Sequence, residues 1–303
     1  MFRFRLALLV LLLVGTTVSG CGGGTKKKSS GVSLDDQYRK AMTEPDLAAR
    51  ASQLLTIAER QRQAGDVLGM EQSLSSAADA AKRIGDAKPK ALALNRVAEA
   101  LGRADRMGEC KSLLREVSTA ADGIEEPELK VTALTRMAYT YGKHLKNTDI
   151  ATAYLKTSEE IADGISRPEG RIDALLEVAL TCHQLELAER AKGVSDKSLA
   201  AARGLDDVRK RADGVASGAA TLSKMGKTDE AQATFLEAEK LIGEIPDPMS
   251  RSYAWIHLSD QYKAASRRPD AQRALQQAEN AADKVTDSSL RNPLLETIDR
   301  SRR

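Results

Sequence analysis

Aromatic side chains are scarce in this chain: Phe, Trp and Tyr together make up 3% of its 303 residues. Phe2 and Phe4 lie in an N-terminal segment that we expect to be removed, so the folded part is poorer still in rings. Its core must therefore be built from Ala, Leu, Ile and Val. Such a core suits closely packed helices, because Ala lets two helix backbones approach each other.

Strand patterns are nearly absent as well. No run of residues alternates between apolar and polar at a period of two, and β-branched residues are scattered. An excess of one charge sign is also missing, since the net charge is +3 and two of these charges come from Arg3 and Arg5 in the removed segment. Such a balance argues against nucleic acid as a partner. We therefore predict an all-α protein that does not bind nucleic acid.

Residues that carry chemistry are rare. His144, His183 and His257 lie far apart, and no pair has the spacing of metal ligands. Cys110 and Cys182 are expected to be buried on different helical units, further apart than the roughly 7 Å between Cα atoms that a disulfide allows. No strand leads into a Gly-rich phosphate loop. We predict no metal, no cofactor and no enzymatic activity; His or carboxylate groups converging in a deep pocket would favour the enzyme hypothesis.

The first 20 residues have the three-part build of a signal peptide. A basic start with Arg3 and Arg5 is followed by an apolar run over residues 6–14 and by small or polar residues up to Gly20. The apolar run is too short to cross a bilayer, which takes roughly 20 residues. We predict residues 1–20 as a signal peptide.

The end of this segment, Val18-Ser19-Gly20-Cys21, resembles the lipobox of bacterial lipoproteins. The resemblance implies that Cys21 is acylated on its sulfur and that the chain is cleaved before it. Two or three acyl chains hold a protein on a membrane stably, whereas one does so only marginally. The alternative is an ordinary signal peptide with an incidental cysteine. Gly22 stands where enterobacterial inner-membrane lipoproteins often carry Asp, which favours the outer membrane, facing the periplasm.

Residues 21–33 have almost nothing apolar to bury and are predicted to form a flexible tether. A random coil of about a dozen residues reaches roughly 20 Å. Its three lysines, Lys26, Lys27 and Lys28, either contact anionic head groups or remain solvated as part of a linker.

The rest of the chain repeats itself about every 40 residues. Small residues are separated by 40, 40, 41, 40 and 40 positions: Ala58, Ala98, Ala138, Ala179, Ala219 and Ser259. Apolar residues keep the same step: Ile84, Ile124, Ile165, Leu205, Ile245 and Val285. One extra residue near Asn147 accounts for the single spacing of 41. Large apolar residues flank each small one at spacings of three and four, which indicates one face of a helix.

Each unit is predicted to be a pair of helices joined by a turn. Gly226 would end a first helix, and Thr228 or Asp229 would cap the second. Four prolines are predicted to open first helices: Pro45, Pro127, Pro168 and Pro248. Alanines recur late in the second helices, where neighbouring hairpins are expected to meet: Ala81, Ala121, Ala162, Ala202 and Ala282.

The unit in which Trp255-x2-Leu258-Ser259-x2-Tyr262 precedes Ala271-x3-Leu275-x2-Ala278 resembles the tetratricopeptide repeat. Weaker copies extend the resemblance over residues 45–285. The period is 40 rather than 34, and HEAT-like repeats, which share the longer period, are the alternative. The resemblance implies a right-handed superhelical solenoid of about six hairpins over residues 34–287, with a capping helix at 288–303.

Tetratricopeptide proteins bind partners in a concave groove lined by exposed residues of the first helices. Matching positions here include Glu59, Glu99, Asp173, Asp213, Tyr253, Asp260 and Lys263. Our candidate partner contacts are Arg103, Tyr139, Lys143, His183 and Lys224. The resemblance implies a membrane-anchored scaffold that holds a protein or peptide partner at the cell envelope. A lipoprotein that binds a glycan or small ligand is the alternative, which the shortage of aromatic platforms disfavours.

Overall fold

The computed structural model describes residues 32–302. This part of the chain contains 14 α-helices and no strand, which confirms the prediction of an all-α protein. The helices are α1 (Leu34–Met42), α2 (Leu47–Ala64), α3 (Val67–Lys82), α4 (Ala87–Arg103), α5 (Met107–Asp122), α6 (Pro127–Lys143), α7 (Thr148–Asp163), α8 (Pro168–Gln184), α9 (Ala188–Arg203), α10 (Val208–Lys224), α11 (Thr228–Gly243), α12 (Pro248–Ala264), α13 (Arg268–Ala282) and α14 (Ser288–Arg302). The predicted signal peptide and nearly all of the predicted tether lie outside the described residues.

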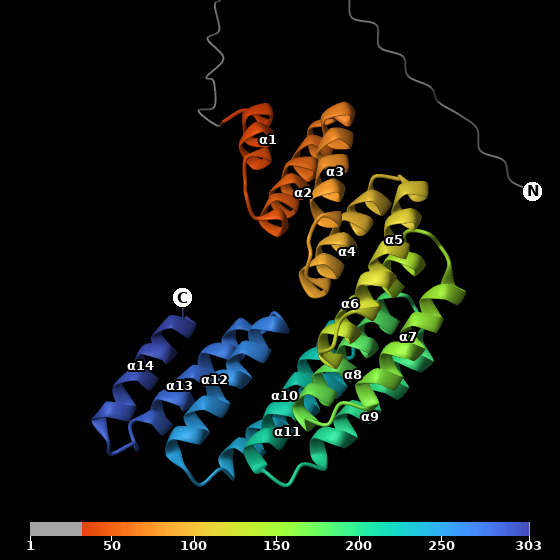
Figure 1. Ribbon diagram of the computed structural model, residues 1–303. Helices are drawn as coiled ribbons and strands as arrows, with labels where there is room; N and C mark the ends of the chain where they lie inside the picture. The colour runs from red at the N-terminus through yellow and green to blue at the C-terminus, as the bar shows by residue number, and fades with distance from the viewer. Residues whose placement is uncertain (1–31, 303) are drawn as a thin grey trace, which may run out of the picture. The chain divides into compact units, whose positions relative to one another are not determined.

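Twelve of these helices form six hairpins, from α2/α3 to α12/α13 (Figure 1). The two helices of a hairpin pack along each other and are joined by a short turn. Each first helix also packs against the first helix of the next hairpin. Each second helix likewise packs against the first helix of the next hairpin. This is a TPR-like helical-repeat arrangement, in which every hairpin packs mainly on its neighbours. The buried hydrophobic residues form clusters along the stack, the larger of which span several helices.

Single helices lie at both ends of the stack. The short α1 packs on α2, and α14 packs on α12 and α13. Helix α14 buries Leu294 and Ile298 against the last hairpin and leaves most of its other residues in contact with solvent. The ammonium of Lys263 donates to the carbonyl oxygen of Ser301 at 2.7 Å. The apolar surface that the last hairpin would otherwise expose is thereby covered.

The lengths of the helices and connections explain the period. The unit from α4 to α5 consists of a first helix of 17 residues, a turn over 104–106, a second helix of 16 residues and a loop over 123–126. The turn between α6 and α7 spans 144–147 and is one residue longer. The extra residue predicted near Asn147 is therefore confirmed.

The predicted register is confirmed by burial. The six small residues of the first helices are at most 2% exposed, and the five alanines of the second helices are all fully buried. Contact between hairpins explains why they are small: a Cβ added at Gly214 of α10 would lie 2.9 Å from the Cβ of Ala202 on α9. Any larger side chain in this alanine series would push two hairpins apart.

Two predictions about helix starts were wrong. Pro127, Pro168 and Pro248 do occupy the first turn of their helices, but Pro45 precedes Asp46, whose carboxylate caps α2 by accepting from the backbone N–H groups of the first turn. Helix α11 begins at Thr228, and its N-cap is Lys227, which makes no side-chain capping bond. The reason is the short turn: Gly226 already reverses the chain with φ of +75°, so Thr228 falls inside the helix.

Every hairpin turn contains one residue in the left-handed region, and only two of the six are glycine. They are Gly65, Asp105, Lys146, Glu186, Gly226 and Ser266, with φ between 53° and 75°. This conformation costs a residue with a Cβ roughly 1–2 kcal/mol. Glu186→Gly is therefore expected to raise the free energy of unfolding by up to about 1 kcal/mol, after the entropy that glycine gains in the unfolded chain is subtracted.

The measurement is a urea unfolding curve followed by circular dichroism. The matched control is Gly226→Glu, the reverse change at the equivalent position one unit later, which is expected to lower the unfolding midpoint. A Glu186→Gly protein no more stable than wild type would contradict the assignment of strain to these turns.

Candidate functional site

The exposed surface of the first helices, here called the first-helix face, carries one residue from each hairpin at the same place in the repeat. These residues stand two positions before the buried small residue and form the central column: Thr56, Arg96, Arg136, Glu177, Ser217 and His257. None of the six is buried. Two hollows open on this face, one at each end of the column, and both are lined by residues of first helices and the loops that precede them.

The first hollow, here called the cationic hollow, lies between α2, α4 and α6 and has a volume of about 560 Å³. It is lined by Leu55, Thr56, Glu59, Arg60, Gln63, Arg96, Glu99, Arg103 and Arg136. Four guanidinium groups thus face two carboxylates. Its wall carries an excess of positive charge that is open to solvent.

Several of these charges are already paired inside the molecule. Glu59 accepts two hydrogen bonds from the guanidinium of Arg62, at 2.8 and 2.9 Å, and these bonds lower the pKa of Glu59 to about 2. Arg103 donates to the Glu99 carboxylate one turn earlier at 2.7 Å. By contrast, the exposed Arg96 and Arg136 make no side-chain hydrogen bond or ion pair with any residue in 32–302. Arg60 donates to the amide oxygen of Gln37 at 2.8 Å. Of the four guanidiniums that line the hollow, Arg96 and Arg136 are therefore the two without a side-chain partner in the described chain.

Three of the candidate contacts meet around a residue that sequence reasoning did not select, His144. The rings of Tyr139 and His144 touch edge to face with centroids 6.0 Å apart. His144 lies against Gly102, where an added Cβ would come within 2.7 Å of it. Burial lowers the pKa of His144; the Glu99 carboxylate opposes this shift, and the charges of Arg103, Lys146 and Lys143 add to it. Tyr139 therefore contacts His144, and the charges of Arg103 and Lys143 act on the same imidazole.

The other two candidates lie elsewhere on the face. His183 is half-buried near the end of α8, and Lys224 is exposed at the last residue of α10. Neither lines either of the two hollows. The five predicted residues thus form one group of three and two isolated positions.

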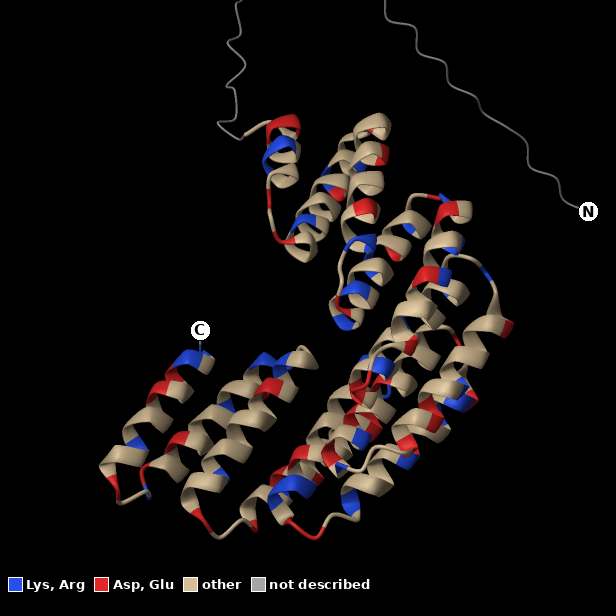
Figure 2. Cartoon of the chain, viewed as in Figure 1, with Lys and Arg blue, Asp and Glu red and all other residues tan. Residues whose placement is uncertain are grey.

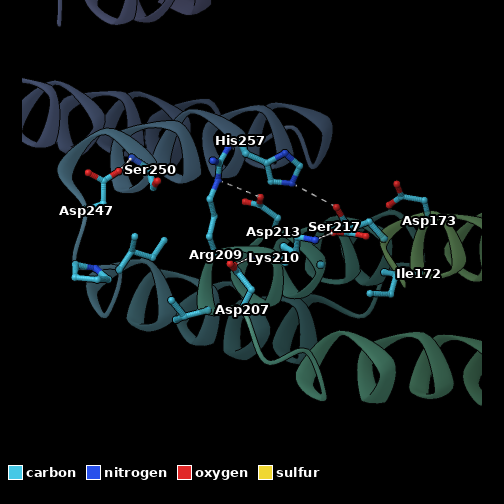
Figure 3. Close-up of a pocket in the computed structure, with 15 residues that line it drawn as sticks. Ile172, Asp173, Asp207, Arg209, Lys210, Asp213, Ser217, Asp247, Ser250 and His257 are labelled. Carbon is cyan, nitrogen blue, oxygen red and sulfur yellow. Dashed lines mark hydrogen bonds and ion pairs between the residues drawn. The ribbon is translucent and has the colours of Figure 1, made fainter. Parts of the chain in front are cut away.

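The second hollow, here called the acidic cavity, lies between α8, α10 and α12 and has a volume of about 690 Å³ (Figure 3). It is lined by Glu169, Ile172, Asp173, Asp207, Val208, Arg209, Lys210, Asp213, Gly214, Ser217, Ile245, Pro246, Asp247, Ser250 and His257. Five carboxylates therefore face two cations and one imidazole. Two of the carboxylates, those of Asp207 and Asp247, cap the helices that follow them.

Two aspartates of this cavity lack full internal partners. Asp173 is exposed by surface area and makes no side-chain hydrogen bond or ion pair within the described chain, although desolvation by the surrounding protein raises the pKa of its carboxyl. Burial raises the pKa of Asp213 as well. Its Oδ2 lies 3.9 Å from Nε of Arg209, while its Oδ1 is shielded from solvent and accepts no hydrogen bond in the described structure. Figure 3 shows both carboxylates beside the cavity.

A histidine and carboxylates do converge here, which is the observation that would favour an enzyme. Oγ of Ser217 is 3.5 Å from Nε2 of His257, at the outer limit of a hydrogen bond, and the Gln261 amide approaches the same nitrogen at 3.4 Å. No carboxylate of the described residues bonds the other ring nitrogen. A nucleophile–base pair needs such a partner to orient the imidazole, so this geometry does not form a catalytic triad.

The remaining reactive residues are inert by position. Cys110 and Cys182 are both fully buried and unpaired, as predicted, and burial raises the pKa of each thiol to about 11. A thiolate is the reactive form, and little of it exists at neutral pH. Among residues 32–302 no group of three His, Cys, Asp or Glu side chains is placed to hold a metal ion.

No protein-family model and no curated protein matches this sequence. Some solved structures match this chain distantly. Ton1535 from Thermococcus onnurineus NA1 is 15% identical with a TM-score of 0.41, and the match covers 86% of this chain and 94% of that one. BtubC (BKLC) from P. vanneervenii is 19% identical with a TM-score of 0.33, and the match covers 83% and 91%. Aspartyl phosphate phosphatase F from Bacillus subtilis is 13% identical with a TM-score of 0.38, covering 83% and 64%. These likenesses are too distant to bear on function.

Sequence reasoning placed Asp173 and Asp213 on the groove individually but did not assemble the acidic cavity. A signal was present, because the two residues stand 40 positions apart, as do Ser217 and His257. Residues one period apart lie side by side on adjacent first helices. A comparison of positions one period apart would have grouped these four residues.

Proposed function

We propose that this protein is a lipid-anchored helical-repeat scaffold that binds a polypeptide segment of a partner on its first-helix face. The observation that carries the proposal is the pair of hollows on that face, where charged side chains of successive hairpins lack internal partners. A helical solenoid is suited to this role, because each hairpin contributes equivalent positions to one extended surface. Charged groups on such a surface contribute to specificity and to the rate of association.

The proposed lipid anchor is inferred from the sequence. Within residues 32–302 no helix is long and apolar enough to span a membrane. Cys21 lies outside the described residues, and its place at the end of a lipobox-like stretch supports acylation. We propose that the acyl chains hold the protein on a bacterial membrane, with the outer membrane and its periplasmic face favoured, and that the repeat domain follows a tether.

Cys21→Ser is expected to abolish labelling of the protein by a clickable fatty acid fed to cells, because serine offers no thiol for acylation. Uncleaved precursor should accumulate at the same time. The measurement is in-gel fluorescence beside an immunoblot. Cys110→Ser is the control and should leave labelling unchanged, since its thiol is buried. Continued labelling of the Cys21→Ser protein would refute the anchor.

Partner binding on the first-helix face is tested by a photo-reactive phenylalanine placed at Tyr139. Ultraviolet light on intact cells is expected to give a discrete adduct, and charge reversal of the two unpaired guanidiniums by Arg96→Glu with Arg136→Glu should reduce it severalfold. The matched position is Leu236, which is 53% exposed on the second helix α11 and should give no adduct. Equal adducts from both positions, or none from either, would contradict the proposed face.

A further inference from the structure

The two hollows carry opposite charge although they lie on the same face. Four guanidiniums oppose two carboxylates in the cationic hollow, and five carboxylates oppose two cations in the acidic cavity. Figure 2 shows both signs on every hairpin. The two ends of the face therefore differ in the charge of the side chains that line their hollows, whereas charges of both signs are spread over the whole surface.

The central column connects these two poles. Arg96 and Arg136 line the cationic hollow, and Ser217 and His257 line the acidic cavity. Between them, the carboxylate of Glu177 accepts hydrogen bonds from the hydroxyls of Thr132 at 2.8 Å and Thr135 at 3.0 Å. The face is thus positive at one end and negative at the other, and the carboxylate in the middle already has hydrogen-bond partners within the molecule.

The spacing of the poles matches a short stretch of polypeptide. The hollows are centred on α4 and α10, three first helices apart, and packed helices lie 8–10 Å from each other. The poles are therefore roughly 25–30 Å apart. An extended chain rises about 3.3 Å per residue, so eight or nine residues would connect them.

The unpaired groups define the chemistry of the occupant. Arg96 and Arg136 are exposed guanidiniums without a partner in the described chain, and a guanidinium matches a carboxylate with two parallel hydrogen bonds. Asp213 is a half-buried carboxylate that has only a distant contact with Arg209 and whose Oδ1 accepts no hydrogen bond in the described structure, and Asp173 is an exposed carboxylate without a partner in the described chain. An ammonium or guanidinium entering the cavity would compensate them. A segment bound the other way round would bring like charges together at both ends, which is unfavourable.

We propose that the first-helix face binds a bipolar polypeptide segment in one orientation, with its acidic part on Arg96 and Arg136 and its basic part in the cavity at Asp173 and Asp213. This inference rests on the proposed function and specifies the partner of that same face. The poles select the orientation by charge alone, so the segment is recognised by the order of its charges.

The test uses the full mature chain in detergent and two synthetic 16-residue peptides of identical composition. One has glutamates at one end, a neutral spacer and lysines at the other end; the second alternates the two charges. Fluorescence anisotropy at low salt is expected to give at least tenfold tighter binding of the bipolar peptide. Arg96→Glu with Arg136→Glu, or Asp173→Asn with Asp213→Asn, should each weaken its binding at least tenfold.

The matched control for charge is Lys111→Glu with Lys240→Glu. These lysines are exposed on the second helices α5 and α11 and form no side-chain ion pair in the described chain. The control should bind the bipolar peptide within twofold of wild type. Circular dichroism verifies that each variant is folded.

Orientation is read from a photo-reactive residue at the acidic end of the bipolar peptide. In the wild type its adducts are expected on α4 and α6. Exchanging the poles, with Arg96→Glu, Arg136→Glu, Asp173→Lys and Asp213→Lys together, should move the adducts to α8, α10 and α12. If the exchanged protein does not fold, the proposal is tested by the affinity of the bipolar peptide for the two variants that change one pole each, Arg96→Glu with Arg136→Glu and Asp173→Asn with Asp213→Asn.

Equal affinity for the two peptides, or adducts spread evenly over both poles, would overturn the bipolar proposal. If neither peptide binds while the photo-reactive residue at Tyr139 still gives its adduct in cells, the bipolar proposal fails and the proposed function stands. If that adduct is also absent, both fail.

Discussion

Phe235→Ala is expected to lower the free energy of unfolding by about 3–5 kcal/mol, the usual cost of removing a buried ring. Phe235 on α11 is fully buried and stacks on Tyr262 of α12, with ring centroids 4.3 Å apart. The guanidinium of Arg267 lies over both rings, at 5.3 and 5.2 Å from their centroids. This cluster joins the last two hairpins, so its loss should unfold the C-terminal end of the stack first.

The measurement is urea unfolding together with hydrogen exchange resolved by peptide, in which α11 to α14 should lose protection before α2 to α7. The control is Leu236→Ala on the next residue, which is 53% exposed and should change stability by less than about 0.5 kcal/mol. Similar losses at the two positions would mean that the ring cluster contributes little to the contact between the hairpins.

Ala202→Leu is expected to cost about 1–3 kcal/mol, because it overpacks the contact between α9 and α10. Ala202 is fully buried, and the tight approach at Gly214 leaves no space for a larger side chain. The backbone of α10 would have to move away, and the acidic cavity that α10 lines with Asp213 and Ser217 would change shape. Binding at that end of the face should therefore weaken along with stability.

The same substitution at an exposed alanine of the same helix, Ala188→Leu, serves as the control and should leave both properties nearly unchanged. Thermal unfolding followed by circular dichroism measures the stability of both variants. An unchanged midpoint for Ala202→Leu would mean that adjacent hairpins are not in close contact along the alanine series, which would undermine the repeat register.

Much of the fold could be predicted because it depends on local spacing. A helix buries the positions that recur every three or four residues, whatever its distant neighbours are. The buried series from Ala58 to Ser259 was therefore visible as a period of 40, and the longer turn before Asn147 as its one interruption. The helix starts were harder, and Pro45 and Thr228 were misplaced, because a connection of three or four residues leaves several ways to begin a helix.

Only some of the charged residues on the first-helix face were selected from the sequence, because the pairing of charges within each helix was not considered. Arg103 was chosen as a candidate partner contact, yet Glu99 stands one turn before it and forms an ion pair with it; this spacing of four residues was a usable signal. Arg96 and Arg136, which remain unpaired in the described chain, were not selected. The contact of His144 with Gly102 had no signal, since it depends on how two hairpins are placed against each other.

The sequence by itself determined the helices, their pairing into hairpins and the order of the stack, because burial along a helix repeats at a local period. Only the tertiary structure decided which charges are paired within the molecule and which face outward. Asp173, Asp213 and His257 come from three hairpins and meet at one cavity because adjacent first helices pack side by side. The offset between packed helices depends on the fit of many side chains at once, and no local pattern encodes it.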